Sequence, residues 1–344
     1  MVSLGFWLAA LSVLPAVDDI SKYLFPKETK RLAIINFNAI RDSGYWTEEI
    51  NEGFERGLRD NEQFERITKL MEINPQHLEQ FTICETNTGQ GPERLFFIIR
   101  GQFAYEKAAK GLEEMGKSGE LTSLTIHDLP VYYNHRSREA SYFALVDDHT
   151  LVMSPGKNLL TDALDGLKEL REPSKELADR LNAKALDSFA FRLAGVIPDE
   201  AKRGLKQVPQ FEPIADDLVS YDIVGSLGES PRLQVRLTMS DETAASQCVN
   251  ALTALIAFAK LTGGGARPDL IALLDKVSVK SDELEVLAEL TVTQKQFGDL
   301  VVQGREDREK MRARFKERRE RRLKMKDNEK KDNPPADATK KPAA

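Results

Sequence analysis

The chain has 344 residues, of which 41% are hydrophobic and 30% are charged. These values are those of an ordinary soluble globular protein, and they exclude a membrane bundle or a wholly disordered chain. The length fits two units of about 100 to 200 residues each. The net charge of −6 is unevenly spread, because residues 305–344 hold 16 Lys and Arg against nine Asp and Glu. An acidic body therefore carries a basic tail, which any polyanion would meet first.

The N-terminus carries a nearly uninterrupted apolar run, Leu4–Val17. As a helix this run spans about 21 Å, shorter than the ~30 Å hydrocarbon core of a bilayer. Because polar Asp18 follows directly, we interpret residues 1–17 as a signal peptide with a cut near Ala16. The protein is then exported to the periplasm or cell envelope. If the segment is instead retained as an N-terminal hydrophobic helix, a cytoplasmic location follows.

The patterns in residues 18–172 predict one series of strands and helices. Alternating apolar residues indicate strands, and apolar residues at helical spacing indicate helices. The predicted elements are a strand over 31–40, an amphipathic helix over 46–70, a hairpin with strands 80–85 and 94–100, a helix over 105–115, strands 140–146 and 150–153, and a helix over 159–170.

Residues 173–303 repeat that order of elements. The second series is a strand over 186–193, a helical region after Pro198, a hairpin with strands 217–224 and 232–239, a helix from a Ser240 cap to the glycines at 263–265, strands over 275–280 and 284–291, and a helix over 294–302. The predicted buried stripe of the long helix is Ala245, Val249, Leu252, Ile256 and Ala259. The two series match element for element, with residues 171–185 as the joint.

The internal repeat predicts an α+β fold made of two tandem copies of a split β-α-β, ferredoxin-like unit. Each copy would hold its own, mostly antiparallel sheet with the helices on one face. The opposite face of each sheet would stay open. That face would then pack against the other copy or hold a ligand.

Residues 304–326 predict a charged helix that follows the second copy. The stretch from Arg305 has good helix formers, no Gly or Pro, and oppositely charged pairs four residues apart, such as Glu306 with Lys310. Its apolar residues are too few for a continuous stripe, so the helix projects into solvent or docks on an acidic surface. The composition of residues 327–344 predicts a disordered tail.

The charged helix is the candidate polyanion-binding site, because its basic side chains can neutralise phosphates or lipid head groups. The candidate residues are Arg312, Arg314, Lys316, Arg318, Arg319, Arg321, Arg322 and Lys324. Phe315 is the only aromatic residue among them, which gives little support for base stacking. Behind a signal peptide, an anionic envelope polymer or a lipid surface fits better than nucleic acid. A solvated charged helix without a partner is the alternative.

Histidine and aspartate residues gather in one region, where neighbouring strands can bring them together as in a divalent metal site. The residues concerned are His127, Asp128, His135, Asp147, Asp148 and His149. The Asp-Asp-His-Thr sequence is also an ordinary hairpin turn, in which an Asp side chain accepts a hydrogen bond from its own backbone. We interpret it as the turn, and we predict no metal and no cofactor.

The sequence contains no motif for catalysis. Ser154–Lys157 begins a predicted helix, but the Gly-x4-Gly-Lys-Ser/Thr spacing of a phosphate loop is missing. There is no Gly-x-Ser-x-Gly nucleophile and no Cys with a positioned His. Cys84 and Cys248 lack a CxxC neighbour; two buried free thiols are the simpler interpretation, and a disulfide between them stays open. We therefore predict no catalytic residue.

The segment Asp18–Pro26, leading into Leu32–Ile40, resembles the mature start of uncharacterised exported proteins of planctomycete-type bacteria. In those proteins a leader precedes a Tyr-Leu-Pro phrase and a strand that ends in a Val-Asn-Val-like triplet. Here Phe25 interrupts the phrase, and Asn36-Phe-Asn replaces the triplet. The resemblance implies export and a two-unit fold, and it brings no activity and no site residues.

Together these features predict a non-catalytic, exported cell-envelope protein that binds or scaffolds through its open sheet faces and its basic helix. The alternative is a ligand carrier or enzyme of ferredoxin-like type, with a pocket between the two units. A deep pocket lined by His127, His135 or His149 would favour that alternative. A filled interface between two sheets would favour the first.

Overall fold

The computed structural model describes residues 19–45, 75–86, 95–134, 141–182, 189–263, 268–304 and 311. The chain divides into two compact units, Met1–Val292 and Thr293–Ala344. Several sequence predictions lie outside the described residues: the leader over 1–17, the helix over 46–70, His135, and the basic residues from Arg312 to Lys324.

The first unit contains one sheet of twelve strands. The strands are β1 Thr29–Asn36, β2 Leu78–Thr86, β3 Leu95–Gly101, β4 Thr122–Ile126, β5 Leu129–Tyr133, β6 Tyr142–Leu145, β7 Thr150–Ser154, β8 Phe191–Val196, β9 Leu218–Ser226, β10 Arg232–Met239, β11 Ser278–Asp282 and β12 Glu285–Thr291. The helices are α1 Asp19–Tyr23, α2 Phe37–Asp42, α5 Tyr105–Lys117, α6 Lys157–Glu169, α7 Lys175–Asn182, α8 Asp199–Leu205, α9 Glu242–Gly263 and α10 Pro268–Leu274, with 3-10 turns η1 Pro75–His77 and η3 Glu212–Ile214.

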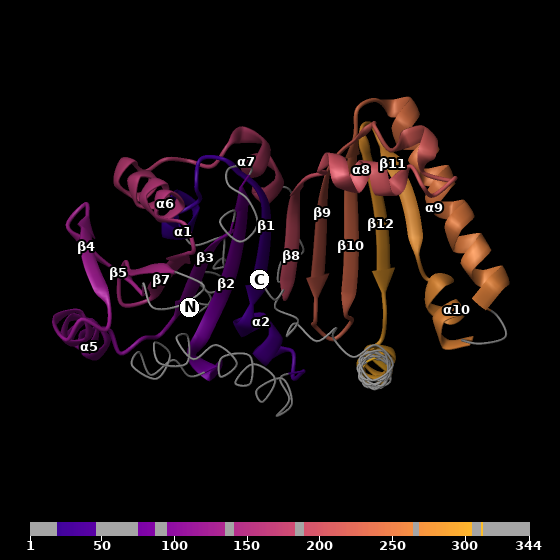
Figure 1. Cartoon of the computed structure of the whole chain (residues 1–344). Helices are drawn as coiled ribbons and strands as arrows, with labels where there is room; N and C mark the ends of the chain where they lie inside the picture. Colours follow the sequence, from indigo (N-terminus) through magenta and orange to yellow (C-terminus); the bar gives the residue numbers. More distant parts are fainter. Residues whose placement is uncertain are drawn as a thin grey trace, which may run out of the picture. The chain divides into compact units, whose positions relative to one another are not determined.

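From edge to edge the sheet runs β11-β12-β10-β9-β8-β1-β2-β3-β7-β6-β5-β4 (Figure 1). Every pair of neighbouring strands is antiparallel. Near the centre β1 pairs with β8, where Ala33 lies opposite Leu193. On one side of this pair β1, β2 and β3 follow one another outward, and on the other side β8, β9 and β10 do the same. The broad prediction of an α+β fold with an antiparallel sheet is confirmed.

Two finer expectations about the sheet are wrong. The two halves do not carry separate sheets, because β1 and β8 join them edge to edge. A split β-α-β unit has a third strand inserted between its first two strands, whereas here β1 pairs directly with β2. The reason lies in the connection after β1: Asn36 at its end lies opposite Gln80 near the start of β2, so the chain returns at the same end of the sheet. Without two facing sheets, the expected pocket between two units loses its basis.

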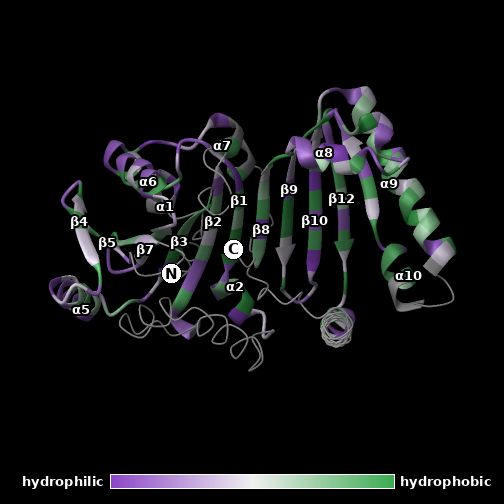
Figure 2. Ribbon diagram, in the orientation of Figure 1, coloured by the Kyte–Doolittle hydropathy of each residue, from purple (hydrophilic) through white to green (hydrophobic). Residues whose placement is uncertain are grey.

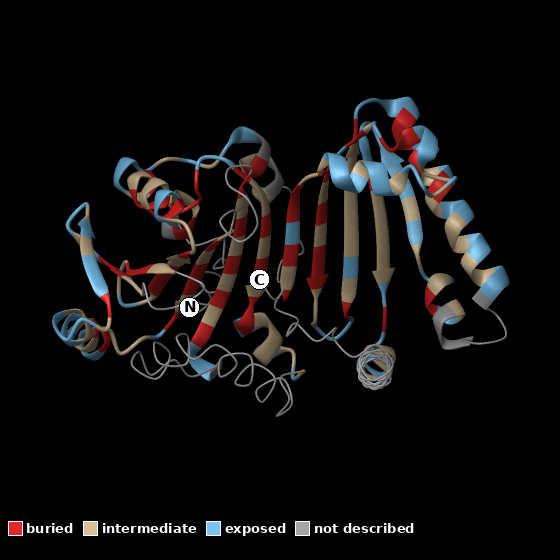
Figure 3. Cartoon of the chain, in the orientation of Figure 1, coloured by how far each residue is buried: buried red, intermediate tan, exposed pale blue. Residues whose placement is uncertain are grey.

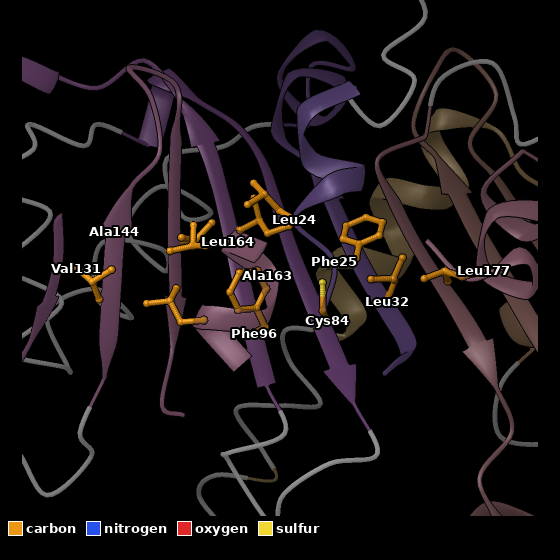
Figure 4. Packing of buried hydrophobic residues seen from close by; sticks show 13 residues of the cluster. Leu24, Phe25, Leu32, Cys84, Phe96, Val131, Ala144, Ala163, Leu164 and Leu177 are labelled. Carbon is orange, nitrogen blue, oxygen red and sulfur yellow. The ribbon is translucent and has the colours of Figure 1, made fainter. Parts of the chain in front are cut away.

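Helices cover both faces of the sheet in the first half. On β3, Ile98 and Ile99 point to opposite faces, as neighbours on a strand do. Ile98 belongs to a core with Cys84 and Leu164 of α6 (Figure 4). Ile99 belongs to a second core with Leu112 of α5. We call these two sides the α6 face and the α5 face. The expectation of helices on a single face is therefore wrong for this half.

A third core lies on the α5 face of the second half. Ala245 and Cys248 of α9 pack there with Leu237 of β10 and Val286 of β12, which lie opposite each other in the sheet. Small side chains on α9 allow the helix to approach the strands closely. Figure 3 shows buried residues in the first turns of α9 and none at its far end.

The predicted joint between the halves contains α7, and a buried ion pair holds this helix to the sheet. Arg192 of β8 donates from Nε and Nη2 to the two carboxylate oxygens of Asp222 of β9, each at 2.9 Å. Its Nη1 donates to the Leu181 carbonyl near the end of α7, at 3.0 Å. A cation at the carbonyl end of a helix is favourable. Leu177 of α7 lies in the α6-face core, so the joint packs as part of the body.

The start of α9 differs by one residue from the prediction. Asp241, not Ser240, accepts the capping hydrogen bond, from the backbone N–H of Ala244 at 2.8 Å. The Ser240 hydroxyl donates instead to Asp217, also at 2.8 Å. Both residue types are good N-caps. Which of the two caps the helix depends on where the chain leaves β10, which ends at Met239.

The described part of the second unit is a helix over residues 294–304. Its first turn is fixed by a capping box. The Gln296 backbone N–H donates to the Thr293 hydroxyl at 3.2 Å, and the Thr293 N–H donates to the Gln296 side chain at 3.2 Å. This helix confirms the closing element that the sequence predicts over 294–302.

Candidate binding surface

The α5 face carries a row of apolar and aromatic residues that crosses eleven neighbouring strands. Residues directly opposite each other in an antiparallel sheet point to the same face. From β11 onward the successive partners are Val279, Ala288, Val235, Ile223, Leu193, Ala33, Ile83, Phe97, Met153, Phe143 and Tyr132. One end of the row packs into the α9 core and the other into the α5 core.

A second row on the same face runs beside the first. Its successive partners are Leu290, Leu233, Gly225, Phe191, Ile35, Phe81, Ile99, Leu151 and Leu145. The two rows contact each other where the rings of Phe81 and Phe97 stack, with centroids 6.0 Å apart. At Gly225 an added Cβ would overlap the ring of Phe191, so this ring takes the place of the missing side chain.

Between the two helix-covered cores these rows are only half-covered. We call this part the central apolar strip, made of Ala33, Ile35, Ile83, Phe191, Leu193, Ile223, Leu233 and Val235. Leu193 and Leu233 are each 37% exposed, and the other members are half-buried. Half-exposed apolar residues in contiguous rows mark a surface that a partner can cover.

One long side of the strip has a polar border. In the next row Tyr221 lies opposite Gly195, which lies opposite Arg31, which lies opposite Glu85. The Arg31 guanidinium donates to the Glu85 carboxylate in a half-exposed ion pair. Burial raises the pKa of the Tyr221 hydroxyl, and the charge of Arg31 partly offsets this rise. An apolar centre with a polar rim is the usual anatomy of a protein interface.

On the α6 face, the part of the second half formed by β10 and β12 has the opposite character. Gln234 and Arg236 of β10 point to this face, and Arg236 pairs with Glu285 at 3.3 Å. Arg232 pairs likewise with Glu289 of β12. These cross-strand ion pairs suit a face that contacts water. The sequence predicted a sheet face that no helix covers. In the structure, the part of the α5 face between the α5 and α9 cores is only half-covered, and this part is apolar.

The histidines that are described do not form one cluster. His127 and Asp128 have positive φ, 48° and 65°, at the tip of the β4–β5 hairpin. The His127 ring contacts Asp165 and, at 3.3 Å, Lys168, both on α6. His149 instead contacts the Gly101 carbonyl at 3.1 Å.

Asp147 forms the ordinary turn that the sequence predicts. Its carboxylate accepts from the His149 backbone N–H at 2.8 Å. Among the described residues, no group of three His, Cys, Asp or Glu side chains could hold a metal ion. Ser154 also serves a turn, because its hydroxyl accepts from the Gly156 N–H at 3.1 Å before α6 begins.

Both cysteines are free and buried. Cys84 lies in the α6-face core and Cys248 in the α9 core, on opposite faces of the sheet. Burial raises the pKa of both thiols, that of Cys248 to about 11. The interpretation as free thiols is confirmed, and a disulfide between the two is incompatible with their positions.

One helix in the described part, Glu242–Thr262 of α9, is long and apolar enough to cross a membrane by length and composition. A core helix of a soluble protein passes the same test of length and composition, but such a helix is mostly buried. Here 17% of the apolar window is buried. Figure 2 shows hydrophobic residues along much of the outer length of this helix.

The central apolar strip is not among the sites that the sequence predicts. Its residues fall in predicted strands, but a local pattern does not say which face stays half-covered. A signal was present in β1, where Leu32, Ala33, Ile34 and Ile35 are apolar at consecutive positions. Consecutive apolar residues indicate a strand with two apolar faces.

Comparisons with known proteins add little. No protein-family profile matches the chain, and no curated protein matches it. A solved structure titled "Structure of crystal form III of TP0453" is similar at a TM-score of 0.45 and 8% sequence identity, over 81% of this chain and 96% of that chain.

Proposed function

We propose that this chain is a non-catalytic, exported cell-envelope protein that binds or scaffolds a partner through its central apolar strip. The observation that carries the proposal is the exposure of Leu193 and Leu233 within apolar rows that are buried under α5 at one end and pack against the α9 core at the other. Apolar surface left in water costs free energy in proportion to its area. A partner that covers the strip removes that cost.

The partner is an amphipathic helix of another protein. On the α5 face, helices already cover both ends of the rows, α5 through Leu112 and α9 through Ala245. A sheet buries an apolar face against helices or against a second sheet. A helix laid on the strip would continue the existing layer, and the polar border at Arg31 and Glu85 would fix its position.

Photo-crosslinking in intact cells tests this proposal. A benzoylphenylalanine at position 193 or 233 faces the strip, and one at Gln234 faces the opposite side of the same strand as Leu233. Positions 193 and 233 should yield a crosslink to an apolar helical segment of one partner, mapped by mass spectrometry, and position 234 should not. Crosslinks from 193 and 233 only to residues of this chain would overturn the proposal.

Export is supported by the apolar run Leu4–Val17 ahead of Asp18. N-terminal sequencing of the protein from fractionated cells tests it. A mature start near residue 17 or 18 in the envelope fraction is the expected result. An intact Met1 in the cytoplasm would refute export.

We also infer that the two halves are tandem copies of one antiparallel unit. Support comes from the matching order around the β1–β8 pair: in each half three strands run outward, the third is followed by a helix, and a later strand returns to pair with the third. The first half then has the additional strands β4 and β5. Expression of residues 189–292 alone tests this inference. Cooperative unfolding of this fragment would support two units, and failure of the fragment to fold would argue against them.

The basic residues from Arg312 to Lys324 remain the proposed polyanion site. Their charge is the support. Because phosphate neutralisation releases counterions, binding to an anionic envelope polymer should weaken steeply with salt. Replacing Arg318, Arg319, Arg321 and Arg322 by Gln removes four of the eight basic residues and should remove about half of that salt dependence. An unchanged salt dependence would contradict the assignment.

A further inference from the structure

α9 changes character halfway along its length. In its first half the residues that face the sheet are small and buried, namely Ala244, Ala245, Cys248 and Ala251. Ser246, Gln247 and Asn250 are exposed on the outside. This first half is therefore an ordinary amphipathic helix with a polar outer face.

The second half of α9 has an apolar outer face. No described side chain after Ala251 in this helix is buried. Ala254 and Ala257 are exposed, Phe258 is 57% exposed, and Leu261 is 85% exposed. Phe258 and Leu261 therefore face outward from the fold. The polar outer residues of the first half do not continue into this part of the helix.

The polar groups of this second half already have partners within the protein. The Thr253 hydroxyl donates to the Val249 carbonyl at 2.8 Å, and the Thr262 hydroxyl donates to the Phe258 carbonyl at 2.9 Å. Lys260 pairs with Asp275 at 2.7 Å. Threonine hydroxyls bonded to the preceding turn are satisfied without water. The outer surface from residue 253 to 262 therefore tolerates an apolar medium.

We propose that the second half of α9 docks into a lipid surface. Its first half is fixed on the sheet by Ala245 and Cys248, so the helix lies in the membrane interface and does not cross it. Phe258 and Leu261 insert among the acyl chains. The surface carries few charges, and its one lysine is paired, so the attraction is hydrophobic and not directed at anionic head groups.

A lipid surface fits better than a protein partner at this place. Phe258 and Leu261 protrude from the helix, and the exposed residues beside them, Ala254 and Ala257, are small and have no polar side-chain group. Lys260, which lies between Phe258 and Leu261, is paired with Asp275. A protein interface has a polar rim that supplies hydrogen bonds to the partner. On this surface the polar side chains already bond to groups of the same chain. This docking surface is separate from the central apolar strip, and each proposal can fail without the other.

A site-specific fluorophore tests the inference in the full chain. Ala257→Cys places a nitrobenzoxadiazole label on the apolar half, and Ser246→Cys places the same label on the polar half as the matched control. The two native thiols are buried and will not react in the folded protein. The protein is mixed with vesicles of pure phosphatidylcholine at 0.1 M and 0.5 M NaCl, and brominated phosphatidylcholine serves as the quencher.

The expected result is a several-fold rise in emission at position 257, quenched by brominated lipid and unchanged by salt, with little change at position 246. Adding Phe258→Gln and Leu261→Gln to the 257 variant should abolish the rise. Equal responses at 257 and 246, or a response only to vesicles that contain phosphatidylglycerol at low salt, would overturn the proposal. A rise at 257 that depends on protein concentration without vesicles would assign the surface to a second copy of the chain and would also overturn it.

Discussion

Arg192 and Asp222 form a buried, two-bond ion pair between β8 and β9, and the same guanidinium holds the Leu181 carbonyl of α7. Their side chains are 3% and 4% exposed, so water does not screen the charges. A buried ion pair contributes little net stability, but the loss of one partner leaves an uncompensated charge.

Replacing one member of this pair should therefore be costly. We expect Arg192→Met to lower the free energy of unfolding by about 3–5 kcal/mol, because Asp222 is left buried and unpaired. The double variant with Asp222→Leu should recover most of the loss. Urea unfolding of the three proteins measures this, and a double variant less stable than Arg192→Met would contradict it.

The buried thiols predict a pH dependence. Their pKa values are raised in the folded state, that of Cys248 to about 11. Above about pH 9 the unfolded thiols lose their protons first, so their contribution to stability is present below that pH and is lost as the pH rises through the folded pKa. Between pH 8 and pH 10, the urea midpoint of the wild type should fall further than that of the double variant Cys84→Ala/Cys248→Ala. Equal falls would show that the thiols ionise alike in both states.

Gly225 should tolerate a side chain poorly. A Cβ there would overlap the ring of Phe191, and overpacking costs about 1–3 kcal/mol. Gly225→Ala should therefore lower stability, and Phe191→Leu in the same chain should reduce the cost of the added methyl group. A double-mutant cycle in urea measures the coupling, and strictly additive losses would argue that the ring does not lie over Gly225.

The cap of α9 gives a smaller effect. Asp241→Ala removes the acceptor for the Ala244 N–H and should cost about 1 kcal/mol. Asp241→Asn retains an acceptor and should cost less. Ser240→Ala serves as the comparison, since the Ser240 hydroxyl donates to Asp217 at 2.8 Å and to Asp241 at 3.5 Å and is not the acceptor of the Ala244 N–H. Thermal melting of the three variants distinguishes the two residues as caps.

Local structure could be predicted from the sequence where its cause is local. The hairpins β2–β3 and β9–β10 follow from alternating residues and turn formers, and the structure has both. The end of α5 lies two residues beyond the predicted helix, at Lys117, where Gly119 takes a positive φ of 74°. Such boundaries depend on neighbouring residues.

The rest depends on distant residues. The pairing of β1 with β8 joins residues more than 150 positions apart, and no local pattern specifies it. The predicted stripe of α9 is right at Ala245 but fails at Ile256 and Ala259, which are not buried. Periodicity predicts which side of a helix is apolar, but not how much of it packs against the sheet. The contact of His127 with Asp165 likewise exists only because the β4–β5 hairpin reaches α6.

The antiparallel contact of β1 with β8 also constrains the order of folding. During synthesis, the N-terminal half emerges before β8, and the backbone N–H and C=O groups on the outer edge of β1 stay unpaired until Phe191–Val196 follows. A nascent chain that stops before this point exposes an edge that recruits identical edges from its neighbours. The first half therefore carries an aggregation-prone edge until β8 has been made.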